Sequence, residues 1–174
     1  WAARVPSSSA SFLQALGNAQ GSGVRIIPAP AASSRSITQE GATFADTHVR
    51  MGIGAGDGGQ VIWPLLMGVN RAKYFLMTGD RLPAEEAERL GLVNFIVDNG
   101  ELMPKAKEIA ERLASGPAQA ISASKVPVNK YIKMISNLVL PLSLNLEGAT
   151  MAGADAREAA EAFREKRDPK FTGR

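Results

Sequence analysis

Five glycines occupy eight consecutive positions, from residue 52 to residue 59, and this run constrains the fold more than any other feature of the chain. Glycine has no Cβ atom, so such a run can turn tightly and lets bare backbone approach another group closely. A helical pattern begins directly after it, which places the run at a helix N-terminus, where backbone N–H groups are free to bind. The sequence therefore predicts either a purely structural tight turn or a ligand-binding loop at this position.

Three of these glycines also match the spacing of a dinucleotide-binding loop. Gly54, Gly56 and Gly59 satisfy the G-x-G-x-x-G pattern, and Asp80 follows about twenty residues later. That pattern requires a continuous apolar strand directly before the glycines, whereas residues 45–50 are polar at nearly every second position. A P-loop is excluded because no Gly-Lys-Ser/Thr ending is present. A dinucleotide-dependent oxidoreductase therefore rests on the glycine spacing alone.

The overall composition describes one domain of ordinary size. The chain has 174 residues, of which 45% are hydrophobic and 21% charged, and it contains no cysteine, so disulfide scaffolds, cysteine-based zinc sites and thiol enzymes are excluded. Its 20 basic and 17 acidic residues are interspersed, so we expect no nucleic-acid partner. The longest apolar runs hold about nine residues, too few to span a bilayer, so we expect no membrane association. The absence of cysteine fits a cytoplasmic location.

The first 43 residues differ from the rest in composition. Serine and alanine make up 17 of them, only four carry a charge, and no helical or strand period persists. We therefore expect an irregular leader over residues 1–43 and a folded domain over residues 44–174. Two origins of the leader stay open: sequence foreign to the fold, through a truncated or mis-framed gene reading or an artefact, and a genuine replacement. The composition favours the first.

Regular periodicity begins at residue 44 and predicts a mostly helical chain. Pro64 is expected to kink the first helix, because a proline inside a helix removes one backbone hydrogen bond. The pattern predicts, in chain order, short helices at about 60–67 and 70–77, a helix between Pro83 and Gly91, a short buried strand at 92–97 and an amphipathic helix at 101–114.

The last third of the chain alternates between helical and strongly apolar segments. Helix is expected to about residue 134, with a break near Pro127. Residues 138–151 are so apolar that they must be buried or pressed against a partner, which favours oligomerisation. Asp155 and Glu158 have capping-box spacing and mark the start of a final helix. That helix ends in basic residues that either bind phosphate or complement the helix dipole: Arg164, Lys166 and Arg167.

Two side chains near the glycine run are candidates for acid–base chemistry. His48 is the only histidine, so a multi-histidine metal site is excluded, and no acidic cluster shows metal-ligand spacing, so we expect no metal. His48 is either an acid–base group or a structural histidine hydrogen-bonded beside Asp46. Asp57 is the only carboxylate inside the glycine run, and it either contacts a ligand or caps the following helix.

Several spaced segments together resemble the enoyl-CoA hydratase/isomerase (crotonase) family. The resemblance covers residues 44–174 in the order and spacing of that family. Its motifs are Phe-Ala-Asp-Thr-His-Val-Arg-Met-Gly-Ile-Gly-Ala-Gly-Asp-Gly-Gly at 44–59, Leu-Met-Thr-Gly-Asp-Arg-Leu at 76–82, Ala-Glu-Glu-Ala at 84–87, Gly-Leu-Val at 91–93 and Phe-Arg-Glu-Lys-Arg at 163–167.

This resemblance implies an α/β fold, more closely an α+β spiral. It consists of part of a crotonase-like ββα spiral followed by a helical C-terminal region that supports trimers. It also implies an acyl-CoA thioester substrate and an enoyl-CoA hydratase or isomerase activity. In that family two backbone N–H groups hold the thioester oxygen and stabilise an enolate while another group moves protons. The resemblance therefore implies no cofactor besides the coenzyme A thioester, and a homo-oligomer, trimer or hexamer.

The resemblance also assigns roles to individual residues. It places Gly54, Gly56 and Gly58 beside the acyl pocket. It places Phe163 and Lys166 at the adenine end of coenzyme A.

The catalytic groups of the family are matched only in part. The second catalytic glutamate of hydratases, in a Pro-Glu pair, corresponds to Thr47-His48 here, so His48 is the acid–base candidate at that position. Asp57 is the second catalytic candidate, because it is the carboxylate of the glycine run that a ligand could reach. The oxyanion-hole loops and the first catalytic glutamate of the family are not recognisable in residues 1–43. A non-catalytic relative that binds acyl-CoA or stabilises a subunit is therefore the first alternative, and the dinucleotide-dependent oxidoreductase is the second.

Overall fold

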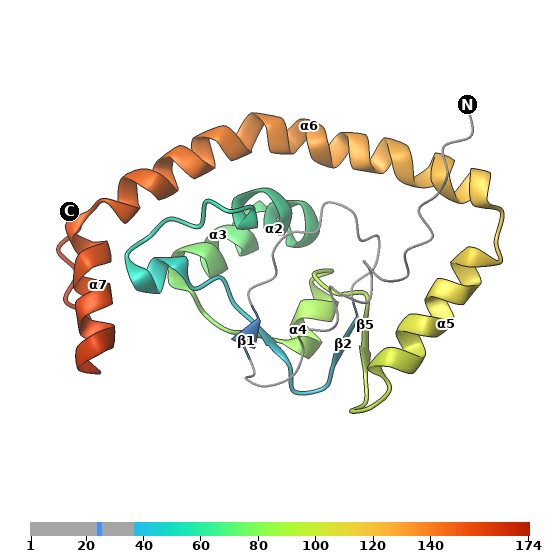
Figure 1. Cartoon of the computed structure of the whole chain (residues 1–174), viewed down its shortest axis with the longest axis horizontal. Helices are drawn as coiled ribbons and strands as arrows, with labels where there is room; N and C mark the ends of the chain where they lie inside the picture. The colour runs from blue at the N-terminus through green and yellow to red at the C-terminus, as the bar shows by residue number, and fades with distance from the viewer. Residues whose placement is uncertain (1–23, 26–36) are drawn as a thin grey trace.

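One long helix arches over the rest of the chain (Figure 1). The computed structural model describes residues 24–25 and 37–174. The helix α6 (Ala118–Met151) has 34 residues and lies above the neighbouring helices α2 (Gly59–Met67) and α3 (Val69–Thr78). At its two ends stand α5 (Leu102–Ala114) and α7 (Ala154–Glu165), so α6 connects opposite sides of the molecule.

Two small sheets lie below α2 and α3. In the first sheet β3 (Thr43–Phe44) lies between β1 (Val24–Arg25), which is parallel to it, and β4 (Leu82–Pro83), which is antiparallel. In the second sheet β2 (Ile37–Gln39) pairs in parallel with β5 (Phe95–Val97). Short strands linked through helices agree with the predicted α/β class. β1 and β2 lie within the range 1–43, of which residues 1–23 and 26–36 are outside the described residues.

The core lies between the α2–α3 pair and α4 (Ala84–Arg89), which follows β4. Trp63 of α2 meets Phe75 of α3 edge to face, with ring centroids 6.1 Å apart, as aromatic pairs prefer. The buried residues of this core cluster are Phe44, Trp63, Met67, Ala72, Leu82, Ala84, Ala87, Leu90, Leu92 and Val93.

Four of the predicted helices are confirmed as α2, α3, α4 and α5, and Pro64 lies inside α2 without ending it. The strand predicted at 92–97 is confirmed only for 95–97, and these three residues are half-buried. The first part of that prediction is wrong because the backbone N–H groups of Leu92 and Val93 both donate to the carbonyl of Ala87. Those two residues therefore complete the end of α4 instead of pairing in a sheet.

The predicted break near Pro127 is wrong, because α6 continues through Pro127 and Pro141. A proline removes one helical hydrogen bond but leaves those on either side, so a long helix can bend and continue, and α6 is visibly curved (Figure 1). Apart from Ser143, the side chains of the apolar stretch 138–151 are not buried in the described part of the chain, and that of Leu138 is 73% exposed. Among the described residues, no helix is long and apolar enough to cross a membrane.

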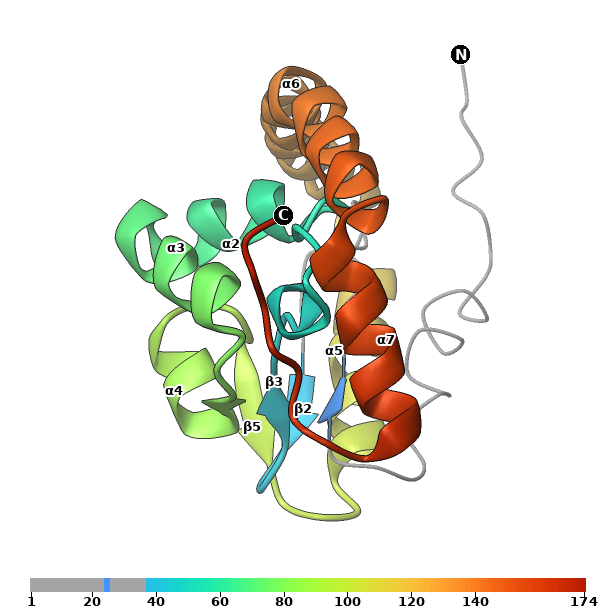
Figure 2. The same cartoon turned by 90° about the vertical axis from the view of Figure 1, so that its left-hand side faces the viewer.

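The final helix is confirmed as α7, but the predicted side-chain cap is wrong. Gly153 is the N-cap residue, and no side chain caps the helix. The carboxylate of Asp155 instead accepts hydrogen bonds from the backbone N–H groups of Thr172 (2.7 Å) and Gly173 (2.8 Å). The C-terminal tail therefore runs back along α7, as Figure 2 shows.

Candidate active site

A 3-10 helix, η1 (His48–Met51), follows β3 and leads into the glycine run. It ends at Gly52, whose φ of +67° is a left-handed conformation that favours glycine. A Cβ atom at Gly52 would lie 2.7 Å from the backbone carbonyl carbon of Asp155, so α7 packs directly against this turn. The turn therefore fixes both the direction of the glycine run and the position of the C-terminal helix.

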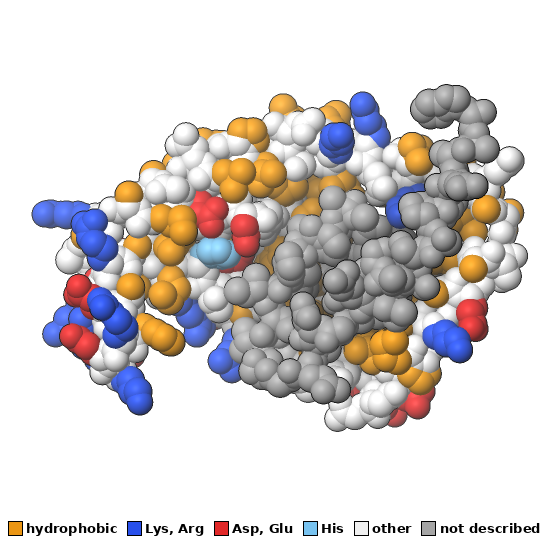
Figure 3. Space-filling view, in the orientation of Figure 1, with side chains coloured by type: hydrophobic (Ala, Val, Ile, Leu, Met, Phe, Trp, Pro, Cys, Tyr) orange, Lys and Arg blue, Asp and Glu red, His pale blue; other side chains and the backbone are white. Residues whose placement is uncertain are grey.

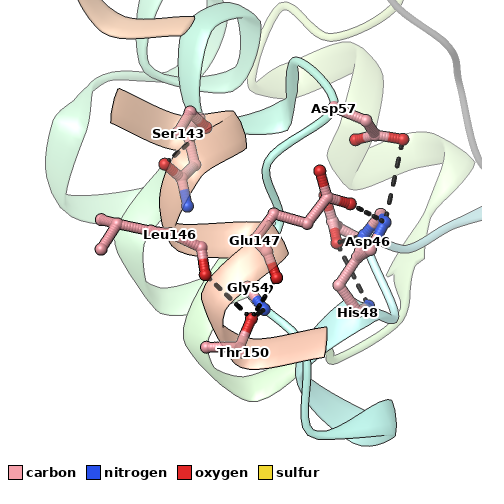
Figure 4. A network of polar contacts seen from close by, with 9 residues as sticks. Asp46, His48, Gly54, Asp57, Ser143, Leu146, Glu147 and Thr150 are labelled. Carbon is pink, nitrogen blue, oxygen red and sulfur yellow. Dashed lines mark hydrogen bonds and ion pairs between the residues drawn. The ribbon is translucent and has the colours of Figure 1, made fainter. Parts of the chain in front are cut away.

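His48 is held on one side by a buried carboxylate. Its Nδ1 atom lies 2.7 Å from Oδ1 of Asp46, and its backbone N–H donates to the same oxygen at 3.3 Å (Figure 4). Asp46 is only 6% exposed, while the His48 side chain is 18% exposed. The imidazole therefore has one anchored edge and one edge that solvent or a ligand can reach, and it is visible at the surface in Figure 3.

Two further carboxylates face the other edge of the imidazole. Nε2 of His48 lies 3.8 Å from Oδ2 of Asp57 and 3.7 Å from Oε1 of Glu147 (Figure 4). Both distances exceed a direct hydrogen bond. A proton or a small polar group near Nε2 would therefore lie within reach of two carboxylates and one imidazole.

These carboxylates raise the pKa of His48 above its ordinary value of 6.5. Burial of the ring lowers that pKa, and it is the largest single influence. The hydrogen bond to Asp46 raises it, and so do the negative charges of Asp46, Asp57 and Glu147, which together outweigh burial. His48 therefore holds a proton more firmly than an unperturbed imidazole does, as an acid–base group beside carboxylates would.

The sequence argument against a metal relied on spacing along the chain, but the fold brings three possible ligands close together in space. One potential ligand atom from each of Asp46, His48 and Asp57 lies within 4.8 Å of the others. The spacing argument is thus wrong for these three residues. The 2.7 Å hydrogen bond between Asp46 and His48 already occupies one such pair of atoms, and the absence of a metal stays a prediction.

The glycine run brings bare backbone against α6. A Cβ atom at Gly56 would lie 2.6 Å from Oε2 of Glu147 and 2.7 Å from the carbonyl oxygen of Ser143, so only glycine lets α6 approach this closely. The N–H of Gly54 donates to Oγ1 of Thr150 at 2.9 Å. This close approach places Glu147 beside His48.

The predicted roles of the glycine run are tested by this packing only in part. Gly58 has a φ of +125° and precedes α2, and Asp57 does not cap that helix, because its N-cap residue is Gly58 with no side-chain hydrogen bond. The interpretation of Asp57 as a cap is therefore wrong. The glycines lie against α6 of the same chain, and an acyl pocket beside Gly54, Gly56 and Gly58 stays a prediction.

The two residues assigned to coenzyme A lie at the end of α7. The side chain of Phe163 is 78% exposed, and Lys166 adopts a left-handed backbone conformation, with φ of +56°, at the end of the helix. The guanidinium of Arg167 is already engaged within the chain, because it binds the carboxylates of Glu158 and Glu165, the latter at 2.6 Å. Contact of Phe163 and Lys166 with coenzyme A stays a prediction.

Three residues of α6 complete the site and were not expected there. Ser143, Glu147 and Thr150 share one helix face, because they are spaced by four and three residues. The hydroxyl of Ser143 donates to Oε1 of Gln60 in α2 at 2.8 Å, which ties α6 to the end of the glycine run. Polar residues at this spacing within the apolar segment 138–151 are the signal in the sequence, but nothing in the sequence connects that face to His48.

Residues 16–174 of the chain match the model of the protein family described as "Enoyl-CoA hydratase/isomerase". It belongs to the enoyl-CoA hydratase/isomerase family. One relative of similar sequence is the crotonyl-CoA hydratase of Syntrophomonas wolfei, which is 36% identical to this chain over 135 residues. The aligned part covers 78% of this chain and 52% of the relative. The chain therefore spans about half the length of the curated relatives it matches.

Solved structures confirm the partial crotonase fold. Carnitinyl-CoA hydratase from Mycobacterium avium superposes with a TM-score of 0.76 and 28% identity, covering 83% of this chain and 56% of that one. A β-diketone hydrolase from the cyanobacterium Anabaena superposes with a TM-score of 0.68 and 30% identity, covering 78% of this chain and 54% of that one. The solved structures that are similar to this chain thus include enzymes whose names indicate different reactions.

Proposed function

We propose that this chain processes acyl-CoA thioesters through a stabilised thioester enolate, nominally as an enoyl-CoA hydratase or isomerase that needs no other cofactor. The observation that carries the proposal is the imidazole of His48, which lies beside the glycine run and faces Asp57 and Glu147 at 3.8 and 3.7 Å. Family membership and the names of the relatives support the thioester substrate.

In hydration, His48 acts as the proton carrier. Neutral Nε2 takes a proton from water as the water oxygen forms a bond to C3 of the enoyl thioester. The electron pair of the C2=C3 bond moves toward the thioester carbonyl and forms the enolate. The imidazolium then returns the proton to C2, so that one water is added in total. Asp57 and Glu147 stabilise the imidazolium in the interval between these two steps, because they place negative charge beside it.

The test is to incubate the chain with crotonyl-CoA and to follow the thioester by mass spectrometry. We expect the thioester to gain one water, and we expect His48→Gln to lower the rate at least about 100-fold. Asp98→Asn is the matched control, because Asp98 is exposed on a turn between β5 and α5, and its rate should equal that of the unaltered chain.

The other outcomes identify the alternatives. Binding of coenzyme A with no change of the thioester would support a non-catalytic relative that binds acyl-CoA or stabilises a subunit. Saturable binding of NAD without binding of coenzyme A would support the dinucleotide-dependent oxidoreductase. The position of the glycine run after η1, and not after a strand, argues against that last function.

A second candidate function is hydrolysis of a β-diketone. It is favoured by the 30% identity to the hydrolase from Anabaena, together with an imidazole at the position of a hydratase glutamate. Water would add to one carbonyl carbon and the adjacent carbon–carbon bond would break, giving a carboxylate and a ketone. Incubation with a cyclic 1,3-diketone distinguishes the two functions, because only the hydrolase opens the ring.

We also propose that Phe163 and Lys166 contact the adenine end of coenzyme A. Their exposure at the end of α7, which packs against η1 through Gly52, supports this placement. Lys166→Gln should weaken coenzyme A binding by up to about fivefold, the effect of one exposed ion pair. Lys107→Gln is the control, since Lys107 lies on α5 at the opposite end of the arch (Figure 1), and it should leave the affinity unchanged.

Finally, we propose a cytoplasmic homo-oligomer, trimer or hexamer, formed through the outer surface of α6. The exposed apolar side chains of this helix support the proposal, because monomers rarely leave large apolar patches in water. They are Val126, Val128, Tyr131, Met134, Leu138, Leu142, Leu144, Leu146 and Met151.

A further inference from the structure

Asp46 is a buried acidic residue that the proposed proton transfer does not itself use. It lies between β3 and η1 and is 6% exposed. One of its carboxylate oxygens accepts two hydrogen bonds from His48, from Nδ1 at 2.7 Å and from the backbone nitrogen at 3.3 Å. Burying a carboxylate is costly unless hydrogen bonds compensate. The hydrogen bonds of this buried carboxylate to His48 therefore indicate that its role concerns the imidazole.

The second oxygen of Asp46 is accommodated by a glycine. A Cβ atom at Gly59 would lie only 2.5 Å from Oδ2 of Asp46 and 3.1 Å from Cδ2 of Leu76. Gly59 is the first residue of α2, so the carboxylate lies against the positive end of a helix dipole, where negative charge is favoured. The last glycine of the run thus makes the space in which Asp46 is held.

The hydrogen bond determines which ring nitrogen carries the proton. A carboxylate oxygen can only accept, so Nδ1 of His48 is the donor in the 2.7 Å contact. In the neutral ring Nε2 then has the free electron pair, and it faces Asp57 from the glycine run and Glu147 from α6. These two residues and Asp46 are the charged groups that face the imidazole from the described elements around it.

We propose that Asp46 is a positioning residue that holds His48 in the tautomer with its proton on Nδ1 and aims Nε2 at the reacting atoms. The inference rests on the proposed function for its catalytic consequence, but the tautomer and the orientation of the ring are properties of the chain alone. Asp46 acts through His48 and touches no substrate.

The test uses the fact that His48 is the only histidine of the chain. In a sample labelled with ¹⁵N-histidine, every imidazole signal therefore comes from this residue. We expect the unaltered chain to show the Nδ1–H tautomer and a pKa above 6.5. Asp46→Asn should lower that pKa, because it removes the adjacent negative charge, and it should increase the fraction of the Nε2–H tautomer. An unchanged pKa and tautomer in Asp46→Asn would overturn the proposal.

A second variant covers the case in which Asp46→Asn does not fold. Gly59→Ala adds a Cβ atom against Oδ2 of Asp46 at a position where alanine favours the helix, so it displaces the carboxylate without removing it. It should shift the imidazole signals in the same direction by a smaller amount. Asp98→Asn is the matched control and should leave the signals unchanged, and signals of Gly59→Ala that equal those of the control would also overturn the proposal.

The kinetic readout separates this proposal from the proposed function. If crotonyl-CoA is hydrated, Asp46→Asn should lower kcat about 10- to 100-fold with little change in KM, and the acid limb of its pH profile should move to lower pH. If no hydration occurs even in the unaltered chain, the proposed function fails while the tautomer measurement still decides the role of Asp46.

Discussion

The core beneath α2 and α3 and the long helix α6 are held in place by opposite kinds of packing. The core buries apolar side chains, among them Leu82 and Ala72, which are 0% exposed. Across the described part of α6, the only buried side chain is the hydroxyl-bearing Ser143. The core therefore supplies stability through burial of apolar surface, whereas α6 is positioned by close backbone approach and hydrogen bonds.

The difference in packing leaves α6 with two roles: it positions a residue of the candidate active site, and it exposes an apolar surface. The inner face of α6 delivers Glu147 to His48, and its other faces keep apolar side chains in contact with solvent in the single chain. Variants that affect one region and spare the other therefore test the comparison directly.

The largest expected effect is on the core. Leu82→Ala should lower the free energy of unfolding by about 2–5 kcal/mol, because it leaves a cavity where a fully buried side chain was. Leu138→Ala is the matched control on α6, where the side chain is 73% exposed, and its effect should stay within about 0.5 kcal/mol. Urea denaturation of the single chain measures both, and equal losses would remove the distinction between the two regions.

The next effect concerns the contact between the glycine run and α6. Gly56→Ala should cost about 1–3 kcal/mol, because its Cβ would lie 2.7 Å from the carbonyl oxygen of Ser143 and would force the helix outward. It should also move Glu147 away from His48 and lower activity. Gly148→Ala is the control inside α6, since nothing lies within 4 Å of its Cβ position, and it should be neutral or slightly stabilising. A neutral Gly56→Ala would show that α6 is not held by this approach.

A smaller effect follows from the raised pKa of His48. A group whose pKa is higher in the folded than in the unfolded chain stabilises the fold fully below its unfolded pKa of about 6.5, and this stability is lost as the pH rises through the folded value. The stability advantage of the unaltered chain over His48→Gln should therefore be larger at pH 6 than at pH 8.5. Thermal melts at both pH values measure it, and an advantage that grows with pH would contradict the assigned shift.

The smallest expected effect on folding is on the outer surface of α6. Leu142→Ser should change the free energy of unfolding of the single chain by no more than about 0.5 kcal/mol, because the leucine is 64% exposed. It should nevertheless weaken self-association, since a hydroxyl would enter the proposed apolar contact. Sedimentation velocity checks this, and an oligomer that survives unchanged would place the contact elsewhere.

Much of the fold was predictable from local pattern. The helices α2 to α5 and α7 follow from apolar periodicity and from glycine and proline at their ends, and the family follows from motifs with a fixed order. The break predicted at Pro127 was wrong, because a proline favours a helix end by its local effect, and the sequence does not show that the helix continues on both sides of it. Asp155 was misinterpreted for a similar reason: its partners at 172 and 173 return to it only in the folded chain.

The sequence by itself determined the candidates His48 and Asp57, since both are near neighbours of the glycine run and are recognisable by residue type. Only the tertiary structure decided that Glu147 joins them, because Glu147 comes 99 positions after His48 in the sequence and no local pattern indicates that the two side chains meet. It also decided the place of Asp46, whose burial depends on the missing Cβ of Gly59. Residue type and short-range spacing specify which groups can exchange protons, but their relative position depends on how α6 packs on the glycine run, and such packing is a property of the whole fold.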